Sequence, residues 1–169
     1  RTYGINCITT RCSNNFGPNQ FPEKLIPKTI IRTIKNLKIP IYGDGNQIRS
    51  WIYVNDHVTA IESLIQKGKP GNVYNITSYE EISNKTIVKK ILNLMNSSTD
   101  MIEFVSDRPG HDKRYSINSS KLENEILWKP KYSFDDALKE TVTWYLQNKQ
   151  WWEPLINDNV LHPQPWTLN

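Results

Sequence analysis

Apolar residues recur along this chain at two spacings, one typical of strands and the other of helices. β-Branched and apolar residues dominate positions 5–13, which predicts a strand, and positions 14–18 are expected to form the loop that follows. From Pro22 to Asn36 the apolar positions lie three or four residues apart, as on one face of a helix. The same spacing after a polar cap predicts four more helices, from Asn55 or Asp56 to about Lys67, from Ser83 or Asn84 to about Asn96, from Ser119 or Ser120 to just before Trp128, and from Phe134, capped by Ser133, to about Asn148.

Short apolar runs separate these helices. They predict further strands at residues 39–42, 50–54, 72–76, 102–105 and 114–117. Strands that alternate with helices indicate an α/β fold. A complete doubly wound domain would have more strands before its first helix, so the pattern predicts the end of a larger parallel sheet followed by a smaller α/β lobe. The tail after Trp151 is rich in tryptophan and proline and has no clear periodicity.

The composition restricts what the chain can bind. Its 169 residues suffice for one domain or parts of two, and no stretch approaches the ~20 apolar residues of a membrane span. A net charge of +4 favours an anionic ligand but is too small and scattered to indicate nucleic acid. Cys7 and Cys12 would face opposite sides of a strand, so we expect two reduced core residues of a cytoplasmic protein rather than a disulfide.

The beginning of the chain is unusual. Its first residue is Arg1 rather than Met, and the residues that follow are typical of a helix end that leads into a strand through Gly4. A natural protein rarely starts at such a point, so we expect a fragment or a protein truncated at its N-terminus.

Some residues match the patterns of functional sites, but a structural role explains them better. The histidines are isolated, and without a paired spacing of histidine or cysteine we expect no metal site. Tyr145 and Lys149 have the spacing by which a lysine lowers the pKa of a catalytic tyrosine, yet they lie at the end of the last helix beside Trp144 and Trp151. We expect a chance match there, and tryptophans that pack rather than stack on a ligand.

The run from Asp107 to Arg114 concentrates two acids, two arginines, a lysine and a histidine around Pro109 and Gly110. A guanidinium offers paired N–H donors to phosphate oxygens, and a Pro-Gly turn lets the backbone approach a ligand. Taken alone, a solvated charged loop explains this run equally well. Arg49 follows another glycine-rich turn, and together with Arg108 it would form a clamp on a diphosphate.

Two amides, Asn14 and Asn15, directly follow the first predicted strand. Ligands of open parallel sheets bind beyond the carboxyl ends of the strands, and amides there can both donate and accept hydrogen bonds. An asparagine-rich turn without a ligand is the alternative explanation for this pair.

Taken in order, four stretches of the chain resemble the dTDP-glucose 4,6-dehydratase family, which are extended short-chain dehydrogenases that act on nucleotide sugars. These stretches are residues 11–27, 40–57, 71–76 and 107–115. The resemblance implies a Rossmann-type fold with tightly bound NAD, conversion of dTDP-glucose to dTDP-4-keto-6-deoxyglucose, and a homodimer in the full-length form. Residues 1–17 would be the last strand region of the NAD-binding domain, and residues 18–169 mainly the substrate-binding lobe, with 50–76 packing back on the Rossmann sheet.

The resemblance also implies roles for individual residues. Asn15 matches a position at the nicotinamide end of NAD, and Tyr42 lies in the segment that lines the thymidine pocket. Arg49 and Arg108 match the arginines that hold the diphosphate. The substrate-binding set implied in this way is Asn14, Lys24, Leu25, Pro40, Ile41, Tyr42, Arg49, Asn84, Asp107, Arg108, Pro109, Gly110 and His111.

The chain also departs from the family. It contains no glycine-rich NAD loop, no assignable catalytic Tyr-x-x-x-Lys and no Asp-Glu acid/base pair, so no catalytic residue is assigned and the chain alone is expected to be inactive. Two alternatives stay open. In the first, the chain is part of another nucleotide-sugar enzyme, such as a UDP-sugar epimerase or decarboxylase. In the second, it is a non-catalytic module that binds nucleotide sugar or pairs with a full-length subunit.

Overall fold

Parallel strand pairs organise the chain in the computed structural model, which describes residues 2–167. Arg1, Leu168 and Asn169 lie outside the described residues. Three pairs are parallel along their whole length: β1 (Thr9–Cys12) with β5 (Val73–Ile76), β2 (Asn14–Phe16) with β4 (Ile48–Tyr53), and β3 (Ile39–Tyr42) with β7 (Ile102–Val105). These pairs confirm the predicted α/β class.

Strand β4 pairs with three other strands. It pairs in parallel with β2 and with β8 (Arg114–Tyr115), and antiparallel with β6 (Glu81–Ser83). Asn14 lies opposite Trp51, and Arg49 lies opposite both Ile82 and Tyr115. The polar ends of β2 and β4 are thereby placed beside the charged loop that precedes β8.

The chain changes partners at Ser13, which lies between β1 and β2. Its backbone N–H donates to Ile76 O at 3.1 Å, and its buried hydroxyl accepts from Thr77 Oγ1 at 2.9 Å. The predicted loop at residues 14–18 is therefore wrong over Asn14–Phe16, which form β2. Strand β6 was also missed, because three residues are too few to show an alternating pattern.

Five helices of seven or more residues occur where helical spacing predicts them. They are α1 (Leu25–Ile34), α2 (Val54–Lys67), α3 (Asn84–Leu94), α4 (Ser120–Ile126) and α5 (Phe134–Gln147). Ser83 and Ser133 cap α3 and α5, with their hydroxyls accepting from Thr86 N at 3.2 Å and Asp136 N at 3.1 Å. None of the helices within residues 2–167 is long and apolar enough to cross a membrane.

Helix α2 begins differently from the expectation. It starts at Val54 after Tyr53, and neither Asn55 nor Asp56 caps it. The carboxylate of Asp56 is buried and accepts instead from the backbone N–H groups of Lys131 at 2.9 Å and Tyr132 at 3.2 Å. A tertiary partner has therefore replaced the local cap that the sequence suggested.

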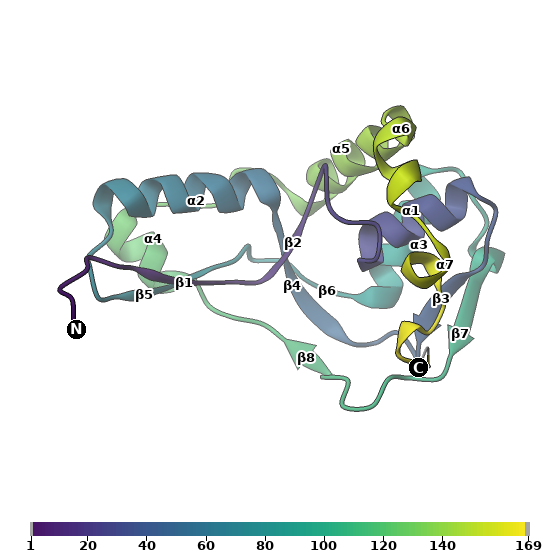
Figure 1. Cartoon of the computed structure of the whole chain (residues 1–169), viewed down its shortest axis with the longest axis horizontal. Helices are drawn as coiled ribbons and strands as arrows, with labels where there is room; N and C mark the ends of the chain where they lie inside the picture. Colours follow the sequence, from purple (N-terminus) through teal and green to yellow (C-terminus); the bar gives the residue numbers. More distant parts are fainter. Residues whose placement is uncertain (1, 168–169) are drawn as a thin grey trace.

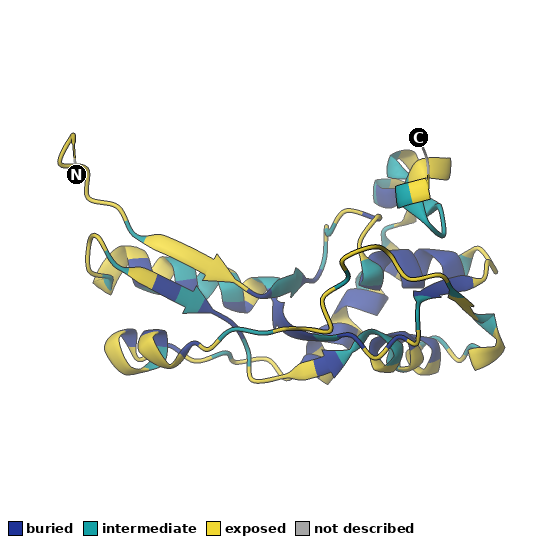
Figure 2. Cartoon of the chain, turned by 90° about the horizontal axis from the view of Figure 1, so that it is seen from below, coloured by how far each residue is buried: buried dark blue, intermediate teal, exposed yellow. Residues whose placement is uncertain are grey.

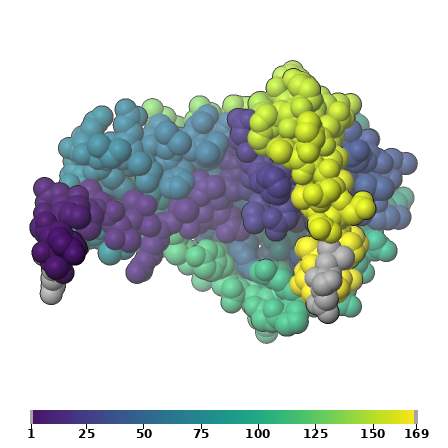
Figure 3. Space-filling model, in the orientation of Figure 1, coloured from purple at the N-terminus to yellow at the C-terminus, as the bar shows by residue number. Residues whose placement is uncertain are grey.

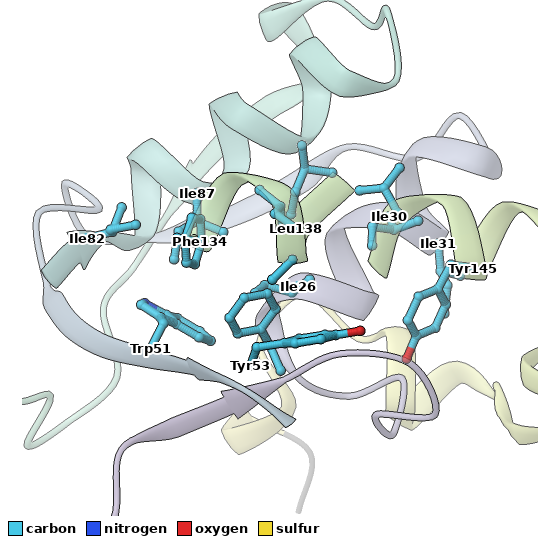
Figure 4. Close-up of a cluster of buried hydrophobic side chains, with 14 of the residues drawn as sticks. Ile26, Ile30, Ile31, Trp51, Tyr53, Ile82, Ile87, Phe134, Leu138 and Tyr145 are labelled. Atoms are coloured by element: carbon cyan, nitrogen blue, oxygen red, sulfur yellow. The ribbon is translucent and has the colours of Figure 1, made fainter. Parts of the chain in front are cut away.

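The main core lies between α1, α3 and α5 on one side and the strands β2, β4 and β6 on the other (Figure 4). Ile26 and Ile30 of α1 pack there with Trp51 of β4 and Phe134 of α5. A second core lies where α2 and α4 cover β5, at the end of the molecule that carries the N-terminus (Figure 1). Trp51, Trp128 and Trp152 are buried, as expected of packing residues.

The N-terminal strand β1 is exposed along its whole length. All four residues of β1, including Cys12, are exposed (Figure 2). Cys7, just before the strand, is exposed as well, and both thiols are free. The predicted core position of these cysteines is wrong, because among the described residues β1 pairs on one edge only and all of its residues are exposed.

The tail after α5 contains short helical segments that its sequence did not reveal. They are α6 (Lys149–Trp152), α7 (Asp158–Leu161) and single 3₁₀ turns at Glu153–Leu155 and Pro165–Thr167. A further 3₁₀ turn, Thr99–Met101, precedes β7. Segments of three or four residues span only about one helical turn, and a repeating pattern needs several turns to be recognised, so periodicity cannot detect them.

Candidate functional site

A cavity of about 520 Å³ opens between β3, the first turns of α1, the loop before β8 and the C-terminal segment. Its volume lies within the range of small-molecule sites, roughly 300–1,000 Å³. Eleven of the residues assigned to a ligand from the sequence line it: Asn14, Asn15, Lys24, Leu25, Pro40, Ile41, Tyr42, Arg49, Asn84, Arg108 and His111. Segments far apart in the sequence thus converge on one cavity, although their individual roles stay predictions.

Two arginines from different elements meet this cavity. Arg49 of β4 is buried, and its Nη1 donates to Ile48 O at 2.7 Å, which fixes the guanidinium against the strand. Burial lowers the pKa of Arg49, and the nearby Arg108 lowers it further, whereas Asp112 raises it. Arg108 reaches the same cavity from the exposed loop before β8. Two guanidinium groups in the lining of one cavity favour an anion between them.

Asp107 holds the loop before β8 in shape. Its carboxylate accepts from Gln47 Nε2 at 3.0 Å, from the Arg108 backbone N–H at 2.8 Å and from His111 Nδ1 at 2.6 Å. Burial alone would raise the pKa of Asp107, but these hydrogen bonds lower it, so the carboxylate is charged. It is thereby already occupied by protein donors.

Three of the predicted ligand residues lie outside the cavity lining. They are Asp107, Pro109 and Gly110. Gly110 has φ of 66°, a left-handed conformation that a side chain would strain, and it turns the loop so that His111 faces inward. Contact of these three residues with a nucleotide stays a prediction. In the structure they belong to the turn that gives the loop its conformation.

The opposite part of the cavity is aromatic and apolar. Tyr42 ends β3, and its ring lies 4.5 Å from that of Trp166 at an angle of 89°, with the His111 ring 6.4 Å away on an edge. Burial raises the pKa of Tyr42, which keeps the phenol neutral. Pro40 and Ile41 complete this wall. Trp166 was expected to pack rather than to face a ligand, and no periodicity around it signalled otherwise.

Amides form a third part of the wall. Asn15 Nδ2 donates to Ser13 O at 3.1 Å, which orients its Oδ1 to accept from His57 Nδ1 at 2.7 Å. Burial lowers the pKa of His57, so the imidazole is neutral and carries its proton on Nδ1. Asn84 begins α3, and its backbone N–H donates to Gln47 O at 3.1 Å. Hydrogen bonds therefore fix the Asn15 amide plane and the Asn84 backbone before any ligand binds.

Sequence reasoning missed two cations in the wall, Lys28 and Arg32 of α1. Lys28 Nζ donates to His162 O at 2.6 Å, and Arg32 donates to Lys38 O and Leu161 O. Burial lowers the pKa of Lys28 to about 8 and also lowers that of Arg32. Their spacing with Lys24, one cation every fourth residue on an otherwise apolar helix, was a signal that could have identified them.

Five cationic side chains line the cavity, and Glu23 is the one carboxylate among its described lining residues. This excess of positive charge favours a ligand with two negative charges. No group of three or more potential metal ligands occurs among residues 2–167.

Tyr145 belongs to the core. It is fully buried, and its hydroxyl donates to Gln20 O, whereas Lys149 belongs to a separate helix, α6. Burial raises the pKa of Tyr145, opposite to the shift that a catalytic tyrosine needs.

Residues 1–141 match the family model described as GDP-mannose 4,6 dehydratase. The chain belongs to this family. A probable dTDP-glucose 4,6-dehydratase from Sinorhizobium fredii is 44% identical over 92% of this chain, and one from Escherichia coli is 42% identical over 93%. Each match covers 46% of the relative, so the chain spans about half the length of these dehydratases and corresponds to their C-terminal half.

Solved structures of the family share this fold. The dTDP-glucose 4,6-dehydratase of Bacillus anthracis, in complex with NAD, is 47% identical with a TM-score of 0.87, over 92% of this chain and 49% of that chain. The enzyme of Streptomyces venezuelae is 39% identical with a TM-score of 0.89, over 92% and 48%. A UDP-glucose 4-epimerase of Thermotoga maritima, 24% identical with a TM-score of 0.82, shares the fold alone. These neighbours are Rossmann-type proteins, as the sequence predicted.

Proposed function

We propose that this chain is the substrate-binding C-terminal part of a dTDP-glucose 4,6-dehydratase, which converts dTDP-glucose to dTDP-4-keto-6-deoxyglucose. The observation that carries the proposal is one cavity with an aromatic end, two converging arginines and a wall of amides. A nucleotide sugar has the same three parts: a flat base, two negative charges and a ring of hydroxyls. The 39–47% identity to dTDP-glucose 4,6-dehydratases over 92% of the chain favours a thymidine nucleotide over a uridine one.

Each part of the ligand has a matching group. Tyr42, with Pro40 and Ile41, offers a surface for the thymine ring, and Arg49 with Arg108 neutralises the diphosphate. Amides and amines at the far wall hold the sugar hydroxyls: Asn14, Lys24 and Asn84, with Leu25 as an apolar contact. The loop from Asp107 to His111 positions Arg108 and covers the nucleotide.

NAD would meet only the edge of this chain. The Asn15 amide, fixed by His57 and Ser13, fits a role beside the nicotinamide, whereas the chain has no glycine-rich loop for the pyrophosphate. Bound NAD supplies a hydride acceptor for the sugar. We assign residues 1–17 to the NAD-binding domain and residues 18–169 mainly to the substrate lobe, with 50–76 packing against the Rossmann sheet, which the parallel pairing of β5 with β1 supports.

In this proposal the residues of the chain bind and orient the nucleotide sugar. They include no acid/base pair for the elimination of water. We therefore infer that the chain alone has no dehydratase activity. An anaerobic assay with dTDP-glucose and NAD is expected to give no 4-keto-6-deoxy product, and any NAD-dependent turnover contradicts this part of the proposal.

Calorimetric titration of the 169-residue chain tests the binding role. We expect dTDP-glucose to bind more tightly than UDP-glucose, and Arg49→Ala to weaken binding by about 10- to 100-fold, since a charged hydrogen bond contributes about 1.5–3 kcal/mol. Arg114→Ala is the matched control, because Arg114 pairs with Glu81 outside the cavity. Tighter binding of UDP-glucose would favour a UDP-sugar enzyme, and equal losses in both variants would contradict a specific arginine clamp.

We also infer a cytoplasmic location and a homodimer in the full-length form. The free thiols of Cys7 and Cys12 support a reducing compartment. Light scattering on the full-length enzyme tests the dimer, and a monomeric mass at all concentrations would contradict it.

A further inference from the structure

The C-terminal segment of the chain lies across the cavity that holds the proposed nucleotide. We call residues 158–167 the strap; they comprise α7 and the turn Pro165–Thr167. In the space-filling view the yellow atoms of the C-terminal segment lie over the blue atoms of the region that contains α1 (Figure 3). Pro165 and Trp166 line the cavity directly.

Two buried cations hold the strap by its backbone. Lys28 Nζ donates to His162 O at 2.6 Å, and Arg32 donates to Leu161 O. Gln164 Nε2 adds a bond to Ser106 O at 3.3 Å, at the start of the charged loop. Burying an ammonium and a guanidinium is costly unless each finds acceptors, and strap carbonyls supply acceptors to both. This section of the tail is therefore built into the wall of the cavity.

The strap places Trp166 at right angles to Tyr42. Their ring centroids are 4.5 Å apart with an angle of 89° between the planes. Two perpendicular rings form a corner, so a flat base that stacks on the face of one ring meets the other ring along its edge. Aromatic rings prefer stacked and edge-to-face neighbours, and a nucleobase can make both contacts in this corner at once.

We propose that Trp166 contacts the nucleobase and, with Tyr42, forms the base subsite, and that Lys28 and Arg32 are positioning residues that hold the strap in place. This inference rests on the proposed nucleotide-sugar function. It adds Trp166 as a residue that recognises the base of the nucleotide. On this view the two cations of α1 act on the ligand through the strap, whereas Arg49 and Arg108 act on it directly.

Titration of the 169-residue chain with dTDP tests the contact. Stacking on an aromatic side chain contributes about 1–3 kcal/mol per base, so Trp166→Ala is expected to weaken binding by about 5- to 100-fold. Trp166→Phe should recover most of the affinity, while Trp166→Leu, which fills space without a ring, should not. Asn159→Ala is the control, because Asn159 is exposed on the strap and does not line the cavity.

A double-mutant cycle tests the positioning role of Lys28. Lys28→Met is expected to weaken dTDP binding in the wild-type background but to have little further effect when Trp166 is already alanine. Lys28→Arg, which keeps a cationic donor, should restore part of the affinity. Equal effects of Lys28→Met in both backgrounds would mean that Lys28 contacts the ligand itself, and this would overturn the positioning role.

The outcomes separate the inference from the function on which it rests. If the wild-type chain binds dTDP and Arg49→Ala weakens it while Trp166→Ala does not, the base contact is wrong and the proposed function stands. Equal affinity of the leucine and phenylalanine variants would also overturn an aromatic contact. If the wild-type chain does not bind dTDP at all, both proposals fail.

Discussion

Arg108 and Arg114 belong to the same charged run of the sequence but meet different partners. Arg114 donates to both carboxylate oxygens of Glu81, at 2.9 and 2.6 Å, while Arg108 lines the cavity. A bidentate pair uses the same N–H groups that would bind a phosphate, so Arg114 is unavailable to a ligand. Asp107 and Asp112 of this run also differ in their partners. Among the described residues, the Asp107 carboxylate accepts hydrogen bonds from three protein donors, and Asp112 does not.

Asp107→Asn is expected to weaken dTDP binding by roughly 10-fold, because it removes the charge that holds His111 and the Arg108 backbone. Calorimetric titration measures the change. Asp112→Asn is the control in the same loop: its charge acts on Arg49, so its loss should leave binding unchanged or strengthen it. A weaker affinity in the second variant alone would contradict this assignment.

His57 should make stability depend on pH. Burial lowers the pKa of His57 below its usual 6.5, so the unfolded chain binds this proton more readily than the folded one. The free energy of unfolding is therefore expected to fall as the pH drops below about 6.5. Urea unfolding at pH 7 and pH 5.5 tests this. His57→Gln, which can still donate to Asn15, should show a smaller loss, and an equal loss would refute the assignment.

Helix α1 has one face in the hydrophobic core and another at the cavity. Ile26, Ile30 and Ile31 enter the core (Figure 4). Lys28 and Arg32 line the cavity. The apolar face was predictable, because burial imposes a helical period on the sequence. The role of the cations in holding the strap was not predictable, since the strap carbonyls that accept from them, His162 O and Leu161 O, lie more than one hundred residues away.

Helix α5 offers a test of local capping. Ser133→Ala should lower the free energy of unfolding by about 1 kcal/mol, because the Ser133 hydroxyl accepts from Asp136 N. Urea unfolding measures this loss. Thr143→Ala on the exposed face of the same helix is expected to change stability by less than about 0.5 kcal/mol. If the two variants lose the same stability, the cap is not the cause.

At the scale of the whole molecule, the N-terminal strand β1 has an open edge. Among the described residues β1 pairs with β5 alone, and the backbone N–H groups of Thr9 and Ser13 bond toward β5, at Asn72 O and Ile76 O. The backbone N–H groups of successive strand residues point alternately to the two edges of the strand. The N–H of Thr10 therefore faces the open edge of β1, away from β5. Such an edge is a template for pairing with another chain.

We therefore expect the 169-residue chain to self-associate with rising concentration. Thr10→Pro should reduce this association without loss of the β1–β5 ladder, because proline removes only an outward N–H. Thr9→Pro is the matched variant and should lower thermal stability, since it removes the bond to Asn72 O. Light scattering over a range of concentrations measures both, and a wild-type chain that stays monomeric would contradict the prediction.

Periodicity and residue chemistry, which are local properties, were enough to predict the α/β class, the five longer helices and the arginine pair Arg49 and Arg108 at the cavity. Tyr42 was predicted as a ligand residue from the resemblance to the dehydratase family. The strands β2 and β6, the exposure of Cys7 and Cys12 and the position of Trp166 became apparent only from the folded chain. Each of these depends on which distant segment covers or pairs with the residue, and a short local pattern carries no information about that partner.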